Sequence, residues 1–318
     1  MNFRSHTPVR DAFGKALLEL GNSNPDVVVL TADLTEAIRV HWFAKAFPHR
    51  FFQMGISEND MIGTAAGLAL AGKIPFVTTF AVFATSLANL PVRLSVGYNQ
   101  ANVKIAASHG GITVGGDGAS HQSFDDLALM RMIPGMTVVA PSDATEAYKA
   151  TLAIAEHKGP VYMRLGRIPT PLITTPESPF NLGKAQVLRA GSDVAIFSIG
   201  TMLSITIEAA QTLETKGVSA RVINIHTLKP LDSDVILEAA RECGCLVTVE
   251  EHTILGGLGG AVSEVISCNY PVPIEMVGIK DTFGESGGPE EILKKYGLTA
   301  RNVVKACYKV IERKRNRA

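Results

Sequence analysis

The residues best suited to chemistry lie in a glycine-rich stretch, SHGGITVGGDGASHQ, at positions 108–122. Five glycines within nine residues disfavour a helix or strand and predict a loop whose backbone comes close to another group. The same loop carries His109, Asp117 and His121, polar side chains that are poorly suited to a core. This combination is typical of a binding or catalytic loop. A metal centre is not expected there, because the loop has neither HxxxH nor CxxC spacing.

Glu58 is a second candidate, in the segment GISEND at positions 55–60. A strand is expected to end just before this segment, and a helix rich in Gly and Ala is expected to run from about Glu58 to Ala71. Parallel sheets bind ligands at the carboxyl ends of their strands, which is where Glu58 would lie. The simpler interpretation is an acidic first-turn residue that complements the helix dipole. Glu58 alone favours the simpler interpretation.

Aromatic and basic residues follow two further predicted strands. Phe80 and Phe83 could form a flat apolar wall for a heterocycle, or could pack in the core. Arg164 and Arg167 lie at the end of another strand. An arginine there could bind a phosphate or sulfonate through paired hydrogen bonds, or could form a salt bridge at the sheet edge.

Two glycine patterns resemble known motifs without matching them. The segment at 256–261, GGLGGA, is not GxGxxG and is not followed by a ribose-binding acid, so it predicts close helix–strand packing. Gly116-Asp117-Gly118 resembles the start of the metal–diphosphate motif of thiamine enzymes, which requires an asparagine about thirty residues later. The next asparagine is Asn181, which is too distant.

The elements that must position these residues follow a parallel α/β pattern, because strand-like runs alternate with helical patterns from end to end. Composition changes after Gly166, where the stretch 168–184 holds four of the sixteen prolines and has no helical period. We therefore predict two doubly wound domains, at 1–170 and 185–318, joined by a linker at 171–184.

Composition excludes several function classes. Thirty basic and thirty acidic residues among 318 give zero net charge, so a field that would recruit nucleic acid or an anionic membrane is absent. The N-terminus lacks the apolar core of a signal peptide, and the four cysteines have neither zinc-ligand nor redox spacing. We expect a cytoplasmic protein that binds neither nucleic acid nor membrane.

The ordered set of segments resembles the transketolase family, with a thiamine-pyrimidine-binding domain followed by the family's C-terminal domain. Each segment is weak alone, but their order is specific and spans the chain. The segments are ADL (32–34), GISEND (55–60), TFAVF (79–83), the glycine-rich loop with its continuation to Met136 (108–136), APSD (140–143), RLGR (164–167), INIHTLKPLD (223–232) and VTVEEHTILGGLGGA (247–261).

The resemblance implies roles at the cofactor, which would be thiamine diphosphate. Glu58 matches the catalytic glutamate that hydrogen-bonds the pyrimidine ring. Phe83 matches the aromatic residue that stacks on that ring, and Phe80 its neighbour. Asp33 matches a cofactor-site aspartate of the family's Ala-Asp-Leu segment.

The resemblance also implies roles at the substrate. His121 matches a catalytic histidine at the reacting hydroxyls, and Asp117 matches an aspartate that reads a hydroxyl of the acceptor. His109 and Arg167 match groups that hold the substrate's phosphate, and Arg167 aligns better than Arg164. The reaction implied is transfer of a two-carbon ketol unit between sugar phosphates, as in the pentose phosphate pathway.

A full-length transketolase binds thiamine diphosphate and Mg²⁺ through an N-terminal domain, and nothing like that domain is found here. The resemblance therefore implies the C-terminal subunit of a split transketolase, active only with an N-terminal subunit that holds the metal. It also implies homodimerisation through this chain and a heterotetramer. Two departures leave the sugar open, and a sulfonated, branched or deoxy sugar phosphate is compatible with them. Ala37 replaces a phosphate-side serine unless Thr35 substitutes, and Ser86 replaces a common aromatic residue.

Two enzyme alternatives share this domain order: the β subunit of a 2-oxoacid dehydrogenase and a relative of 1-deoxyxylulose-5-phosphate synthase. The glycine-rich loop fits transketolase better than the former, because a 2-oxoacid has no long polyol to hold. A third alternative is a catalytically silent module on the same folds. The joint presence of Glu58, Phe83, His109, Asp117 and His121 argues against it.

Overall fold

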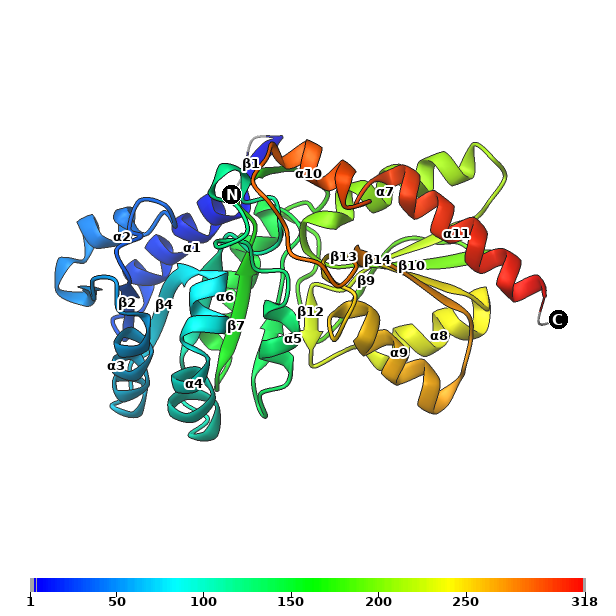
Figure 1. Ribbon diagram of the computed structural model, residues 1–318. Coiled ribbons are helices and arrows are strands. Elements are labelled where there is room, and N and C mark those ends of the chain that lie inside the picture. Colours follow the sequence, from blue (N-terminus) through cyan, green and yellow to red (C-terminus); the bar gives the residue numbers. More distant parts are fainter. Residues whose placement is uncertain (1–2, 4, 317–318) are drawn as a thin grey trace.

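The computed structural model describes residues 3 and 5–316, and its first domain is built on a largely parallel sheet (Figure 1). Within these residues the strand order is β12-β6-β7-β5-β4-β2-β3. The parallel strands are β2 (Val27–Thr31), β3 (Phe51–Gln53), β4 (Ile74–Phe80), β5 (Lys104–Ser108), β6 (Thr137–Val139) and β7 (Val161–Leu165).

Helices cover both faces of this sheet because the buried strands are apolar on both sides. Val27 and Val29 pack in one cluster with α1 and α6, whereas Val28 and Leu30 pack in another with α3. This doubly wound arrangement confirms the predicted fold class. The helices are α1 (Val9–Ser23), α2 (His41–Ala46), α3 (Glu58–Leu70), α4 (Asn89–Pro91), α5 (Asp126–Arg131) and α6 (Ala144–Glu156).

The second domain has the same architecture on a smaller sheet. Its strand order is β14-β13-β10-β11-β9, with only β9 antiparallel among the described strands. Helices α7 and α11 pack together on one face, and α8 and α9 on the other. The elements are β9 (Gln186–Arg189), β10 (Val194–Ser198), α7 (Leu203–Glu214), β11 (Ala220–Asn224), α8 (Ser233–Cys243), β13 (Leu246–Thr253), α9 (Leu258–Asn269), β14 (Ile274–Ile279), α10 (Pro289–Lys295) and α11 (Ala300–Arg315).

Two short strand pairings connect distant parts of the chain. β1 (His6–Pro8) pairs antiparallel with β8 (Pro169–Pro171), at the start of the predicted linker. β12 (Thr227–Lys229) belongs to the second half of the chain, yet it pairs antiparallel with β6 and completes the first sheet. The boundaries of the two domains therefore stay predictions, because a strand from one side of the linker completes the sheet of the other.

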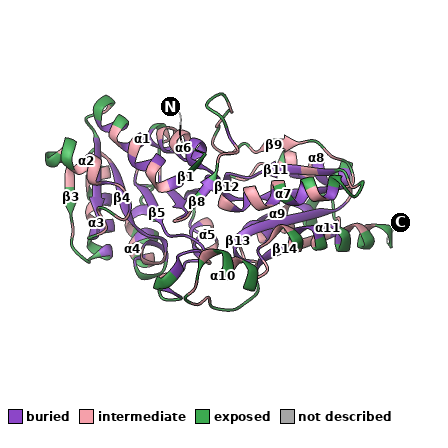
Figure 2. Ribbon diagram, turned by 90° about the horizontal axis from the view of Figure 1, so that it is seen from above, coloured by how far each residue is buried: buried purple, intermediate pink, exposed green. Residues whose placement is uncertain are grey.

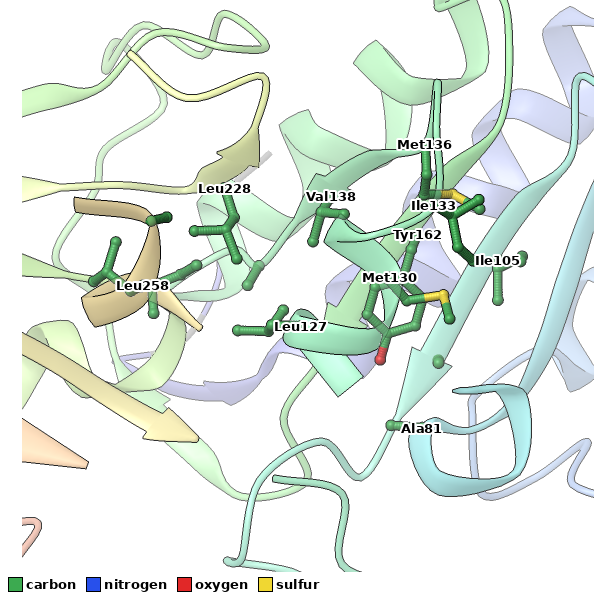
Figure 3. Packing of buried hydrophobic residues seen from close by; sticks show 14 of the residues in the cluster. Ala81, Ile105, Leu127, Met130, Ile133, Met136, Val138, Tyr162, Leu228 and Leu258 are labelled. Atoms are coloured by element: carbon green, nitrogen blue, oxygen red, sulfur yellow. The ribbon is translucent and has the colours of Figure 1, made fainter. Parts of the chain in front are cut away.

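A continuous apolar core joins the two domains. Leu127, Val138, Leu228 and Leu258 are buried in one cluster, and they come from α5, β6, β12 and α9 (Figure 3). The burial colouring shows the central strands of both sheets buried and the outer helix faces exposed (Figure 2). The domains are thus packed as one body, which fixes the loops that lie between them.

A buried ion pair at this junction should be essential for stability. Arg164 of β7 pairs with Asp126, whose side chain is 0% exposed. Burial alone would raise the pKa of Asp126, but the charge and hydrogen bonds of Arg164 outweigh it and lower that pKa. Arg164→Met should lower the free energy of unfolding by about 3–5 kcal/mol, because it leaves a buried carboxylate unpaired. Chemical denaturation checks this value, and the double variant with Asp126→Asn should recover part of the loss. A loss under about 1 kcal/mol, as for a surface pair, would contradict the assignment.

Candidate active site

Four of the predicted site residues form an aromatic cluster at the carboxyl edge of the first sheet. Phe80 ends β4 and His109 follows β5, and the two rings stack with centroids 3.9 Å apart. Phe83 stacks on Phe80 at 5.8 Å and 17°. The His121 ring lies edge-on to Phe83 at 5.5 Å. The structure brings these four together because β4 and β5 are neighbours in the sheet.

Glu58 lies next to this cluster. It is the first residue of α3, and its side chain is almost fully buried, at 4% exposure. The hydroxyl of Thr79, the residue before Phe80, is 3.4 Å from its Oε1. A buried carboxylate with one long hydrogen bond keeps accepting capacity for a ligand. Glu58 and the aromatic wall therefore fit the nitrogen-containing ring of a cofactor such as thiamine diphosphate.

Asp33 lies at the same sheet edge but not in the aromatic cluster. It follows β2 with a positive φ of 57°, and its side chain is exposed. Its backbone N–H donates to Gln53 Oε1 at 2.8 Å. The side chain is thus free to face a bound molecule, and its cofactor role stays a prediction.

The glycine-rich loop is closed at its neck by backbone hydrogen bonds. Gly111 N–H donates to Ser123 O at 2.6 Å, and Ser123 N–H donates to Gly111 O at 3.1 Å. Asp117 is exposed at the tip, on a short helical turn, and His121 is half-buried on the returning side. The loop thus carries Asp117 at its exposed tip and returns His121 to the aromatic cluster.

Two arginines, Arg10 and Arg167, lie near His109 of the cluster. Burial, together with the charges of Arg10 and Arg167, lowers the pKa of His109 to about 3, so its imidazole is neutral near pH 7. Arg167 Nη1 donates to Val114 O in the glycine-rich loop. Two guanidinium groups near one buried imidazole repel one another, and a bound anion between them would offset this repulsion. The arrangement therefore favours an anionic ligand.

Arg10 is the site residue that the sequence did not reveal. It lies on α1, and its Nη1 donates to Ala37 O at 2.8 Å. Its Nε is buried and has no hydrogen-bond partner among the described residues. Burial and the charges of Arg39 and Arg167 lower the pKa of Arg10. Ala37, where a serine was expected, thus supports this arginine through its backbone oxygen.

Arg164 takes no part in the anion site. Its guanidinium donates to Asp126 Oδ2 at 2.8 Å, to Ser123 O at 3.1 Å and to Glu251 O at 2.9 Å. Of the two arginines at the end of β7, Arg164 therefore forms the sheet-edge salt bridge and Arg167 lies near the cluster.

Two kinds of feature are absent from the described residues. Among them, no three His, Cys, Asp or Glu side chains are grouped as a metal site would require. In the same part of the chain, no helix is both long enough and apolar enough to cross a membrane.

Comparisons with known proteins match most of the chain. The model described as "Transketolase, pyrimidine binding domain" matches residues 6–171, and "Transketolase, C-terminal domain" matches 183–303. The chain is 44% identical to a putative transketolase C-terminal section from Methanocaldococcus jannaschii, covering 93% of this chain and 94% of the relative. It is 42% identical to a 6-deoxy-6-sulfo-D-fructose transketolase subunit from Clostridium sp., covering 96% and 95%.

A further relative and a solved structure extend this picture. One subunit of an apulose-4-phosphate transketolase from Phocaeicola vulgatus is 37% identical, with 96% of this chain and 97% of the relative covered. A solved structure described as a split-gene transketolase, an inactive beta4 tetramer, is 48% identical. It superposes with a TM-score of 0.89 over 96% of this chain and 98% of that one.

Proposed function

Since this chain belongs to the transketolase family, we propose that it is the C-terminal subunit of a two-chain transketolase that transfers a two-carbon ketol unit between sugars. Relatives named as transketolase sections or subunits support this, because this chain covers 94–97% of their length. The observation that carries the proposal is the buried Glu58 beside the aromatic wall of Phe80 and Phe83. We place the protein in the cytoplasm and in sugar-phosphate metabolism.

The cofactor half of the site would work through Glu58. Thiamine diphosphate, when bound, supplies the nucleophilic carbon that carries the two-carbon unit. Glu58 would hold a proton on the pyrimidine ring nitrogen, and Phe83 would stack on the ring with Phe80 behind it. Asp33 would contact the cofactor from the end of β2. Mg²⁺ and the diphosphate would be held by the N-terminal partner.

The substrate half would combine hydroxyl and anion recognition. Asp117 and His121 would bind the sugar's hydroxyls, with His121 also moving a proton at the reacting hydroxyl. Arg10, Arg167 and the neutral His109 would bind the terminal anion. Phosphate and sulfonate fit this group equally. One relative is named for a sulfonated sugar and another for a sugar phosphate, so the relatives support both classes of anion.

An exposed apolar face supports docking of another chain. Ile56 just before α3, Leu90 on α4 and Tyr98 on the helical segment that follows α4 are 83%, 64% and 85% exposed. Gly63 and Gly67 on α3 have open space where a side chain would be. Large exposed apolar patches mark interaction sites. We propose that the N-terminal partner and a second copy of this chain bind at this face and at the nearby turn of Phe80–Phe83, giving a heterotetramer.

The first test addresses Glu58. In the assembled enzyme, Glu58→Gln should slow hydrogen–deuterium exchange at the thiazolium C2 by roughly 10²- to 10⁴-fold, because the acid that activates the ring is lost. Proton NMR of the quenched cofactor measures this exchange. Asp60→Asn changes an exposed acid in the same helical turn and should leave it unaltered. Exchange at the wild-type rate in Glu58→Gln would remove Glu58 from the mechanism.

The second test addresses the anion site. Arg167→Ala should raise KM for ribose 5-phosphate by roughly ten- to a hundred-fold, because losing a charge-assisted hydrogen bond costs about 1.5–3 kcal/mol. Arg10→Ala should have a similar effect, and neither should change KM for unphosphorylated glycolaldehyde. Since the pKa of His109 is about 3, no step in KM near pH 6.5 is expected from its titration. Steady-state kinetics distinguish these outcomes, and equal losses with both aldehydes would show that the arginines are structural.

A further inference from the structure

The carboxylate of Glu251 reaches from the second domain to the backbone of the glycine-rich loop. Glu251 lies on β13 and is 3% exposed. Its Oε1 accepts hydrogen bonds from the backbone N–H groups of Ile112 and Thr113, both at 2.8 Å. No role in the chemistry proposed above is given to this carboxylate. The contact spans 139 residues of sequence, so it forms only when the domains are packed together.

Two further hydrogen bonds hold Glu251 itself in place, and a third joins one of its partners to the loop. Its Oε2 accepts a hydrogen bond from the hydroxyl of Thr201 at 3.0 Å. Its backbone oxygen accepts one from Arg164 Nη1 at 2.9 Å. The Arg164 guanidinium also donates to Ser123 O, at the neck of the loop. Glu251 is therefore fixed at both of its carboxylate oxygens and at its backbone oxygen.

Gly111 permits this close approach. Its φ is +91°, a conformation that favours glycine. A Cβ at this position would lie 2.2 Å from Glu251 Oε1. The loop can therefore lie against the carboxylate only because position 111 has no side chain.

We infer that Glu251 is a positioning residue, which fixes the loop backbone so that Asp117 and His121 face the substrate. Ile112 and Thr113 leave the closed neck of the loop toward its tip, so they set the direction of the segment that carries both side chains. Two adjacent buried N–H groups without an acceptor would be costly, and the loop would move to find other partners. The second domain would thus act on the substrate site through the backbone of the loop. The inference rests on the proposed function for its kinetic consequence, but not for its structural one.

Amide hydrogen exchange on the full chain tests the structural consequence without any partner or cofactor. Glu251→Met keeps the length of the side chain but has no oxygen, whereas Glu251→Gln keeps one acceptor. Exchange of the Ile112 and Thr113 amides should accelerate by roughly ten- to a hundred-fold in the Met variant and change little in the Gln variant. Glu250→Met is the matched control, because that equally buried carboxylate binds the first turn of α9 instead.

Kinetics of the assembled enzyme test the functional consequence. Glu251→Met should raise KM for sugar acceptors by about ten-fold or more, whether or not they are phosphorylated, and Glu251→Gln should restore most of it. Thiazolium C2 exchange, which depends on Glu58, should stay at the wild-type rate. A general loss of structure would instead raise KM and slow thiazolium C2 exchange together.

The outcomes separate this inference from the proposed function. Unchanged exchange at 112 and 113 in Glu251→Met would overturn the positioning role, whatever the enzyme activity. If amide exchange accelerates in Glu251→Met but the assembled wild-type enzyme catalyses no ketol transfer, the proposed function is overturned and the positioning role stands. If Glu251→Met does not fold, Thr201→Val removes the hydroxyl that holds Oε2, and it should give a smaller acceleration at the same two amides. Absence of that acceleration would count against the inference.

Discussion

The buried guanidinium of Arg164 is the interaction on which the rest of the site depends. Arg164 lies near the end of β7. Its guanidinium pairs with Asp126 at the start of α5 and donates to the backbone oxygens of Ser123 and Glu251. Burial opposes its charge, but the Asp126 carboxylate raises the pKa of Arg164 and holds it cationic. One side chain thus joins the first sheet, the neck of the glycine-rich loop and the second domain. Because a buried cation needs all of these partners, their relative positions are narrowly defined.

The parts of the site that depend on local sequence could be predicted. Parallel strands end at one sheet edge, and Phe80, His109 and Arg167 lie together there because each is at or just after the end of such a strand. The helix expected over about 58–71 begins at Glu58 and ends at Leu70. Arg10 was missed because it lies in the first turn of a helix and follows no strand of the large sheet, and only the packing of α1 brings it to the site.

Long-range contacts could not be predicted for a related reason. The pairing of β12 with β6 crosses the linker, so no local pattern marks it. Glu251 is one of two adjacent glutamates in a strand, and nothing in its neighbours distinguishes the one that faces the loop. Strand position alone did not separate the two arginines at the end of β7; the family resemblance favoured Arg167, and burial of Arg164 against Asp126 supports that choice. Such assignments depend on how two domains pack, and the periodicity of a single chain does not carry that information.

The described residues offer an aromatic wall, a buried carboxylate and an anion site. We propose that another polypeptide holds the diphosphate and the metal. Calorimetric titration of thiamine diphosphate with Mg²⁺ tests this division most directly, first into this chain alone and then into this chain mixed with an N-terminal transketolase subunit. We expect no tight binding and no ketol transfer for the chain alone, and both in the mixture. Tight cofactor binding with turnover by this chain alone would contradict the division.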